Sequence, residues 1–286
     1  MIQLTDAIYD SLNNKNHHMS IFIDLQKAFD TVSHRVLLNK LEKYGFRGKS
    51  LDMMSSYLCD RESFVGIGSA VSNYAISNIG IPQGSILGPI LFLIYVNDLP
   101  KFSNSIKTTL FADDTTLSLS HSDLSVTTIS MKNELEKFYE WTLANRLTIN
   151  VTKTEALLFS NRTTDRSIIN ITFNNEQINF NKPCRFLGVI FDNKLTFTDH
   201  IDTTAKKVSR FTGILYGIRK YLTKQARLCF YYAYIYPHLS YNIAVWGGSG
   251  ISHLDKLVVL QKRIVRIICD VPSNTHTSPL FPNWVF

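Results

Sequence analysis

The sequence has few cysteines, no long apolar run and no signal peptide, and each absence excludes a class of protein. The 4 cysteines among 286 residues are scattered without a close pair, which indicates neither a zinc site nor a disulfide framework. The apolar run Ile90 to Val96 lies between Pro89 and Asn97 and is too short to span a bilayer. Met1 to Ser20 lacks the basic start and apolar stretch of a signal peptide. We therefore expect a soluble, non-secreted protein without membrane contact.

The net charge of +7 is unevenly distributed along the chain. The segment Ile201 to Asp270 holds 11 Lys and Arg against 3 Asp and is rich in Tyr, so the rest of the chain is close to neutral. Such a segment suits a phosphate backbone, and Lys206, Lys207 and Arg210 would fall about one helical turn apart along it. The alternative is that the charges form a solvated helix face and the aromatic residues form core.

Two adjacent carboxylates, Asp113 and Asp114, follow the apolar residues Phe111 and Ala112 and precede a Thr-rich strand. An isolated Asp-Asp pair is usually a solvated turn. Here, however, Asp24 ends another apolar strand 89 residues before Asp113, far enough for two strands to meet side by side. Like charges this close raise each other's pKa unless cations neutralise them. Two Mg²⁺ or Mn²⁺ ions would do so, and the chemistry of such a pair is nucleotidyl transfer.

A third segment, Gly80 to Pro89, carries Ile-Pro-Gln-Gly between the two acidic strands and precedes an apolar helix and Asn97-Asp98-Leu99-Pro100. In order and spacing, the three segments together resemble the catalytic palm of reverse transcriptases. The closest likeness is to the polymerases of non-LTR, or LINE-type, retrotransposons. Trp141 to Thr154 is similar to a fourth motif of that family, and Cys184 to Val189 is similar to the stretch that supports the primer end.

The resemblance implies a role for each matched residue. Asp24 and Asp113 would bridge two metal ions, and Asp114 would supplement them. Phe29 would exclude a ribose 2′-OH and so select deoxynucleotides; the alternative is that it is a plain core residue. Asp30 is not expected to be a metal ligand, because it would point the other way on an extended chain.

Gln83 and Gly84 would lie beside the incoming nucleotide and the template base, or would simply be a turn that opens a helix. Lys153 would neutralise or protonate the departing pyrophosphate, although a solvated lysine is equally compatible. The turn Phe186-Leu187-Gly188 would hold the primer terminus by apolar contact and backbone bonds. The expected partners are an RNA template, a DNA primer and dNTPs, in the cytoplasm and nucleus.

The resemblance also implies the fold, which is α+β. Residues 1–198 would form a right-hand polymerase palm of antiparallel strands and packed helices, and residues 199–286 a basic helical thumb. Only 23 residues precede Asp24, so we expect the fingers and the upstream endonuclease to be missing and the chain to be part of a larger polyprotein.

Local patterns predict strands at 20–24, 108–112, 115–120 and 155–159, and a hairpin around Gly68-Ser69. Further strands near 168–173 and 186–191 would complete one sheet. Helices are expected near 34–44, 49–58, 85–99 and 124–147, the last with Ile129, Leu135, Phe138 and Trp141 facing inward, and then near 200–221, 224–236 and 251–268.

Three functions remain open. The first is an RNA-directed DNA polymerase, and the second is a catalytically silent retrotransposon remnant that acts at most as a basic nucleic-acid-binding module. The third is another palm-type nucleotidyltransferase or cyclase, which would have no use for the Ile-Pro-Gln-Gly segment or the basic helices.

Overall fold

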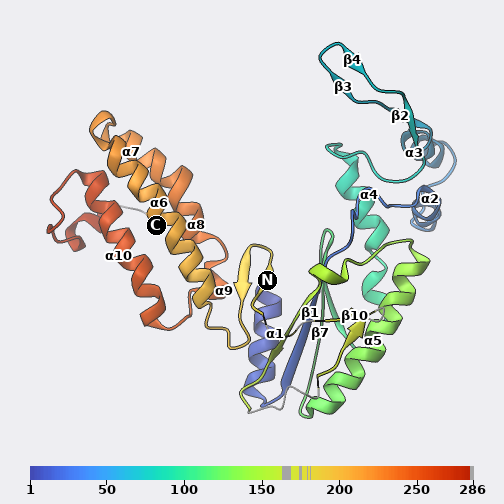
Figure 1. The fold of residues 1–286 in the computed structure, drawn as a ribbon, viewed down its shortest axis with the longest axis horizontal. Coiled ribbons are helices and arrows are strands. Elements are labelled where there is room, and N and C mark those ends of the chain that lie inside the picture. Colours follow the sequence, from blue (N-terminus) through green and yellow to red (C-terminus); the bar gives the residue numbers. More distant parts are fainter. Residues whose placement is uncertain (163–168, 174–175, 179, 181, 284–286) are drawn as a thin grey trace. The chain divides into compact units, whose positions relative to one another are not determined.

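The computed structural model describes residues 1–162, 169–173, 176–178, 180 and 182–283. The chain divides into two compact units. One is Asp10–Lys182, and the other combines Met1–Tyr9 with Pro183–Phe286 (Figure 1). None of the helices in the described ranges combines the length and the apolar character needed to cross a bilayer.

A four-stranded antiparallel sheet lies at the centre of the unit Asp10–Lys182, with the order β6-β7-β1-β8. Its strands are β6 (Lys107–Phe111), β7 (Asp114–His121), β1 (His17–Ile23) and β8 (Glu155–Phe159). All seven residues of β1 are buried, because this strand has a neighbour on each side. The four strands predicted in these regions are confirmed.

Helix α5 (Leu124–Ala144) packs on β7 and β1 (Figure 1). It begins where the Asp123 carboxylate accepts a hydrogen bond from the Ser125 amide, a capping contact that stabilises the first turn. Leu135 and Phe138 are buried in the core as predicted. The prediction for Ile129 is wrong: its side chain is 61% exposed, because it lies outside the stripe that faces the sheet.

Three further helices border this sheet region. They are α2 (His34–Lys43), α3 (Lys49–Leu58) and α4 (Leu87–Val96), with the short turn η1 (Leu99–Lys101) after α4. Helix α2 packs against both α3 and α4. The Ser85 hydroxyl accepts a hydrogen bond from the Gly88 amide, so Ser85 supports the start of α4.

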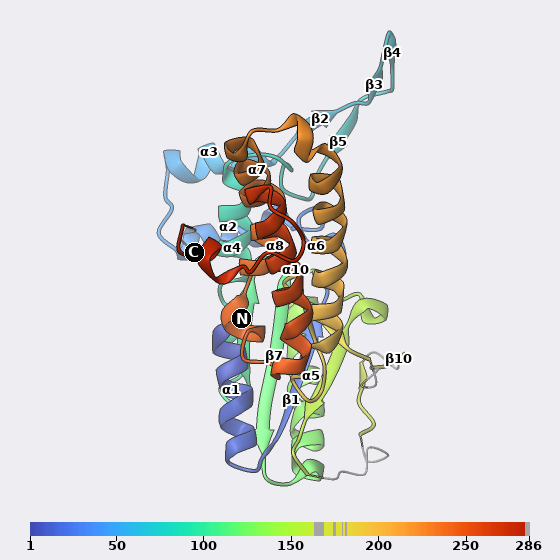
Figure 2. The same ribbon diagram turned by 90° about the vertical axis from the view of Figure 1, so that its left-hand side faces the viewer.

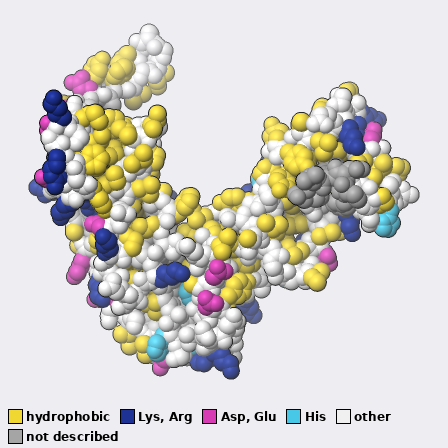
Figure 3. Space-filling model, turned by 180° about the vertical axis from the view of Figure 1, so that it is seen from behind, with side chains coloured by type: hydrophobic (Ala, Val, Ile, Leu, Met, Phe, Trp, Pro, Cys, Tyr) yellow, Lys and Arg dark blue, Asp and Glu magenta, His cyan; other side chains and the backbone are white. Residues whose placement is uncertain are grey.

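The predicted hairpin around Gly68-Ser69 is confirmed and projects from the unit (Figure 1). Its strands are β2 (Arg61–Ser63), β3 (Gly66–Ile67), β4 (Ala70–Val71) and β5 (Ala75–Ser77). The Phe64 and Tyr74 rings meet across it with centroids 5.0 Å apart. Both side chains are exposed, and apolar side chains gather over the projecting arm (Figure 3). The arm is therefore held by its own cross-strand contacts.

The later strands were predicted to complete the main sheet. This prediction is wrong, because they form separate pairs. They are β9 (Thr172–Phe173) with β10 (Glu176–Gln177), and β11 (Cys184–Phe186) with β12 (Val189–Phe191). The chain turns between β11 and β12 because Leu187 and Gly188 both adopt left-handed backbone angles. The start of the strand predicted from 168 lies outside the described residues.

The unit that contains Pro183–Phe286 is mainly helical, and its long helices α6 and α10 pack side by side (Figures 1 and 2). Helix α1 was not predicted; its residues Ile2–Tyr9 belong to this unit and the rest to the other. The remaining elements are α6 (Thr198–Ile218), η4 (Arg219–Tyr221), α7 (Lys224–Phe230), the π-helical turn η5 (Tyr231–Ile235), α8 (Tyr236–Ser240), α9 (Ile243–Trp246), α10 (Ile251–Cys269) and η6 (Ser278–Asn283). The three predicted helical regions are confirmed.

Candidate active site

The register of the central strands brings the predicted acids to one end of the sheet. Ile23, the last residue of β1, pairs with Thr115 of β7, so the next residue, Asp24, lies beside the start of β7. Asp114 pairs with Phe111 across the tight turn that joins β6 and β7, and Asp113 lies in that turn. Three acidic residues from two distant segments therefore lie at the same end of the sheet.

The charges of these acids interact. Burial raises the pKa of the Asp114 carboxyl, and the charges of Asp113 and Asp24 raise its pKa further. Asp24 and Asp113 line the same hollow of about 470 Å³. Such mutual repulsion is what a bound cation relieves.

The donor set fits a magnesium site in its chemistry, since Mg²⁺ prefers carboxylate oxygens. Across the ranges that the structure describes, no three His, Cys, Asp or Glu side chains are grouped closely enough to hold an ion by themselves. This is compatible with the coordination preference of Mg²⁺, which is usually held by one or two carboxylates together with substrate phosphates and water. Asp24 and Asp113 are the residues placed to supply those carboxylates.

Lys153 faces the same hollow from the short turn η2 (Val151–Lys153). Its Nζ lies 3.9 Å from Oδ2 of Asp24, and the lysine side chain is 70% exposed. A long, exposed ion pair of this kind contributes little to stability. Lys153 is therefore held only weakly by Asp24.

The backbone around Asp24 is fixed by the segment that follows α5. The Asp24 carbonyl accepts a hydrogen bond from the Asn150 amide at 2.8 Å, and the Gln26 amide donates to the Thr148 carbonyl at 2.8 Å. These bonds hold the loop that follows β1. Asp24 is therefore fixed by the strand pairing of Ile23 before it and by the bond of Gln26 after it.

Phe29 lies in the same loop, with one side of its ring packed in the core and the residue also lining the hollow. Its ring stacks on buried Phe92 with a centroid distance of 4.6 Å, yet it also lines the hollow with Asp24 and Asp113. An aromatic ring anchored on one side and open on the other can act as a rigid wall. The assignment of Phe29 as a sugar gate stays a prediction.

Gln83 lies against the same loop, because its Nε2 donates to Oδ1 of Asp30 at 2.7 Å. The neighbouring backbone is tight at Gly80, which has φ +84°, since a Cβ there would lie 2.8 Å from the Asp30 carbonyl oxygen. Gly84 also has a positive φ, of 77°, but the space beside it is open. The Gly80–Gln83 turn thus packs directly on the loop that carries Phe29 and Asp30.

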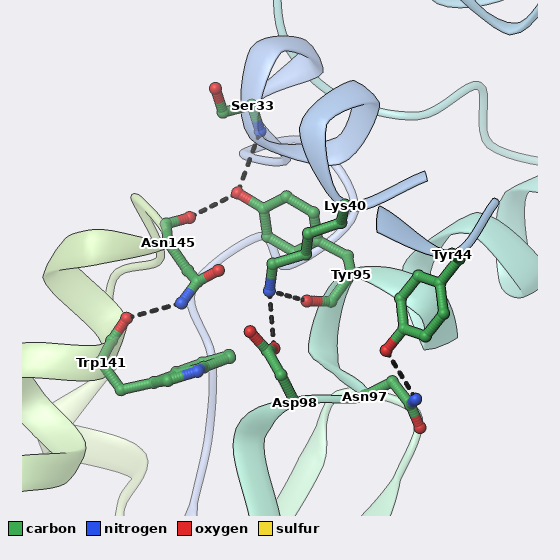
Figure 4. A network of polar contacts seen from close by, with 8 residues as sticks. All are labelled: Ser33, Lys40, Tyr44, Tyr95, Asn97, Asp98, Trp141 and Asn145. Atoms are coloured by element: carbon green, nitrogen blue, oxygen red, sulfur yellow. Dashed lines mark hydrogen bonds and ion pairs between the residues drawn. The ribbon is translucent and has the colours of Figure 1, made fainter. Parts of the chain in front are cut away.

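A buried polar network that the sequence did not reveal supports this loop (Figure 4). The Tyr95 hydroxyl accepts from the Ser33 amide at 3.3 Å and donates to the Asn145 carbonyl. Lys40 donates to the Tyr95 carbonyl at 2.5 Å and to Asp98 at 2.6 Å. Tyr95 therefore joins the start of α2 to the end of α5, the two elements that flank the loop.

Lys40 also lies over two aromatic rings, 5.0 Å from the centroid of Tyr95 and 5.3 Å from that of Trp141. Burial lowers the pKa of the Lys40 amine, whereas the hydrogen bond and charge of Asp98 raise it. Lys40 therefore has a structural role, because it connects Tyr95, Asp98 and Trp141. Tyr95 lies in an apolar run that already contains Phe92, so the sequence carries no signal of the network.

The other predicted contact residues belong to the second compact unit. Leu187 and Gly188 form the turn between β11 and β12, where the Tyr241 hydroxyl donates to the Leu187 carbonyl at 2.8 Å and its ring would lie 3.2 Å from a Cβ on Gly188. Phe186 is buried beneath that turn. The basic side chains predicted to contact nucleic acid are exposed on α6 and are Lys206, Lys207 and Arg210.

The comparison with known proteins agrees with this geometry. Residues 3–191 match the family described as reverse transcriptase (RNA-dependent DNA polymerase). The chain belongs to this family. The third function considered above, another kind of palm-type enzyme, is thereby set aside.

The curated relatives of this reverse transcriptase chain include polymerases of non-LTR mobile elements from Drosophila melanogaster. The RNA-directed DNA polymerase from mobile element jockey is 28% identical over 274 residues, which is 92% of this chain and 30% of the relative. The probable polymerase from transposon BS is 28% identical over 280 residues, or 94% and 31%. The chain thus spans about a third of the length of these relatives. Among solved structures, telomerase from Candida albicans in complex with a fragment of telomeric RNA has a TM-score of 0.43 and 15% identity, covering 99% of this chain and 49% of that one.

Proposed function

We propose that the chain carries RNA-directed DNA polymerase activity and extends a DNA primer on an RNA template with dNTPs. The observation that carries this proposal is the pairing of Ile23 with Thr115, which brings Asp24 beside Asp113 and Asp114. Membership of the reverse transcriptase family and the named relatives point to the same chemistry. We place this activity in the cytoplasm and nucleus.

Asp24 and Asp113 hold two Mg²⁺ or Mn²⁺ ions, and Asp114 supplements their charge. When bound, the ions activate the attacking primer oxygen and stabilise the leaving one. Lys153 leaves Asp24 for the pyrophosphate, to which its ammonium group can give a proton.

Phe29 and Gln83 select and place the dNTP. The Phe29 ring, backed by Phe92, excludes a 2′-OH by contact alone. Asp30 accepts one N–H of the Gln83 amide, and the amide oxygen of Gln83 bonds a sugar or base edge. Gly84 keeps the adjoining backbone open to the substrate.

We assign residues 1–198 to a polymerase palm and residues 199–286 to a helical thumb. In that arrangement the turn Phe186-Leu187-Gly188 supports the primer end. The phosphate backbone of the template–primer duplex contacts three exposed basic side chains of α6, which are Lys206, Lys207 and Arg210.

Primer extension on an oligo(dT)–poly(rA) duplex with labelled dTTP and Mg²⁺ tests the proposal. Asp24→Asn and Asp113→Asn should each lower the rate at least a hundredfold, since a hundredfold corresponds to about 2.7 kcal/mol and a metal supplies several. Asp52→Asn is the matched control, because Asp52 is an exposed acid on α3. Mn²⁺ titration by calorimetry gives a second readout that is independent of turnover.

Equal activity in the Asp24→Asn, Asp113→Asn and Asp52→Asn variants would refute the assignment of the acids. A wild-type chain that binds the duplex and Mn²⁺ but adds no nucleotide would instead support the other function, a silent remnant that acts as a basic nucleic-acid-binding module.

A further inference from the structure

A hollow in the helical unit lies apart from the acids and has the make-up of an anion site. Its volume is about 760 Å³, within the range of about 300 to 1,000 Å³ that is usual for small-ligand pockets. Three arginines line it, Arg219, Arg263 and Arg266, together with Tyr216 and the segment 270–273. All of these residues belong to the unit that contains Pro183–Phe286.

The positive charge of this pocket is largely uncompensated. Its one acid, Asp270, already forms an ion pair with Arg227, which has its Nη2 3.4 Å from the carboxylate and is itself buried. Arg266 is oriented by the donation of its Nε to the Thr275 carbonyl at 2.8 Å, and within the described part of the chain Arg263 has no hydrogen-bond or ion-pair partner. Two guanidinium groups on one helix can grip a phosphate, whose oxygens match the planar fork of arginine.

The same pocket presents a flat surface beside the arginines. The guanidinium of Arg219 lies 3.7 Å from the ring centroid of Tyr216 and donates to the Tyr216 carbonyl at 2.6 Å. Tyr216 is 47% exposed, and Val259 at the rim is 63% exposed. A stacked Tyr–Arg pair is a platform for an unpaired base, because base–aromatic and base–guanidinium stacking need no particular sequence.

We infer that this pocket binds one nucleotide of a single-stranded nucleic acid, with its phosphate on Arg263 and Arg266 and its base on Tyr216 and Arg219. A duplex is a poor occupant, since its bases are stacked and paired and cannot enter the hollow. The site would hold an unpaired strand and does not depend on the proposed polymerase chemistry.

Fluorescence anisotropy with a labelled 12-nucleotide oligo(U) tests the assignment. Arg263→Gln should weaken binding at least about tenfold, because a charge-assisted hydrogen bond is lost. Lys262→Gln is the matched control: Lys262 is the exposed neighbour on α10, carries the same charge and does not line the pocket. It should change affinity less than about twofold. Equal losses in the two variants would overturn the site, since they would show that only diffuse charge matters.

Site-specific crosslinking gives an independent readout. An oligonucleotide that carries 5-iodouridine should crosslink to Tyr216 on irradiation, as mapped by mass spectrometry, and Tyr216→Leu should remove that crosslink. Free ATP and inorganic phosphate should compete only weakly. If ATP competes at concentrations similar to those at which the oligonucleotide binds, the pocket is a site for a free nucleotide, and the proposal that it binds a single strand is refuted. Asp113→Asn should leave every one of these values unchanged, which separates this test from that of the polymerase.

Discussion

Removing the Tyr95 hydroxyl should destabilise the whole acid-bearing unit. Tyr95 is fully buried, and its hydroxyl is hydrogen-bonded to the Ser33 amide and the Asn145 carbonyl, both in buried residues. Burial also raises the pKa of Tyr95, so the phenol stays protonated and able to donate through neutral pH. In Tyr95→Phe the ring remains, but two backbone groups lose their only side-chain partner in this network.

The expected cost follows from those two groups. A buried backbone group left unsatisfied costs about 1 to 3 kcal/mol, so we expect Tyr95→Phe to lower the free energy of unfolding by about 3 kcal/mol. Lys40→Met should cost less, about 1 kcal/mol, because Asp98 is 43% exposed and can regain water. Which of the two variants loses more free energy of unfolding is as informative as the size of each loss.

Urea denaturation followed by circular dichroism measures both values. Tyr44→Phe is a matched control, because its hydroxyl accepts from Asn97 at an exposed position and its loss should cost less than about 0.5 kcal/mol. Amide exchange adds a local readout: the Asn150 amide, bonded to the Asp24 carbonyl, should exchange faster in Tyr95→Phe. If Tyr95→Phe is no more harmful than Tyr44→Phe, the network does not support the acids and our reasoning is wrong.

Three other outcomes are expected. Phe29→Ala should raise ribonucleotide incorporation in primer extension and should also lower the urea midpoint, because the ring stacks on core Phe92; unchanged discrimination would leave Phe29 as core. His18 has its pKa lowered by burial to about 4, so its neutral form is favoured in the folded state and stability should fall as pH drops from 6.5 to 4, by about 3 kcal/mol. Urea midpoints at pH 7 and 4.5 should show this decrease in wild type and less of it in His18→Gln. Replacing Lys206, Lys207 and Arg210 together by Gln should reduce the slope of log affinity for the duplex against log salt concentration by about 3, because each residue neutralises one phosphate. An unchanged slope in an anisotropy titration would contradict their assignment.

The convergence of the acids could be predicted from the sequence because it depends on strand ends alone. Asp24 follows the end of β1 and Asp114 begins β7, and the end of a strand lies beside the start of its antiparallel neighbour, so the turn that carries Asp113 falls at the same edge. The register of β1 with β7 confirms that expectation. Short helices with clear boundaries, such as α3, were predicted to the residue for the same reason: the local signal and the packing agree.

Features that arise from tertiary contact could not be predicted in this way. Tyr95 sits in an apolar run and is indistinguishable there from a core residue, since nothing local indicates that Ser33 and Asn145 will lie beside its hydroxyl. Ile129 was misplaced because α5 is only weakly amphipathic, so several faces of the helix satisfy the apolar pattern equally well. The strand expected near 186–191 was wrongly assigned to the main sheet because nothing local distinguishes a strand of that sheet from one that, like β12, pairs with β11 alone.

Left-handed backbone angles at residues other than glycine also escape prediction from the sequence, and in the described residues they occur both beside the acids and elsewhere. Lys27, Ala112 and Leu187 all have left-handed φ angles, of 47°, 53° and 44°, which cost a residue with a Cβ about 1 kcal/mol or more each. Lys27 lies in the loop after Asp24, Ala112 immediately precedes Asp113, and Leu187 lies in the turn matched to primer support. Glycine would relieve each angle but would leave these turns more mobile in the folded chain. Within the unit that contains Pro183–Phe286, the hydrogen bond from the Tyr241 hydroxyl to the Leu187 carbonyl fixes a backbone conformation that the local sequence disfavours.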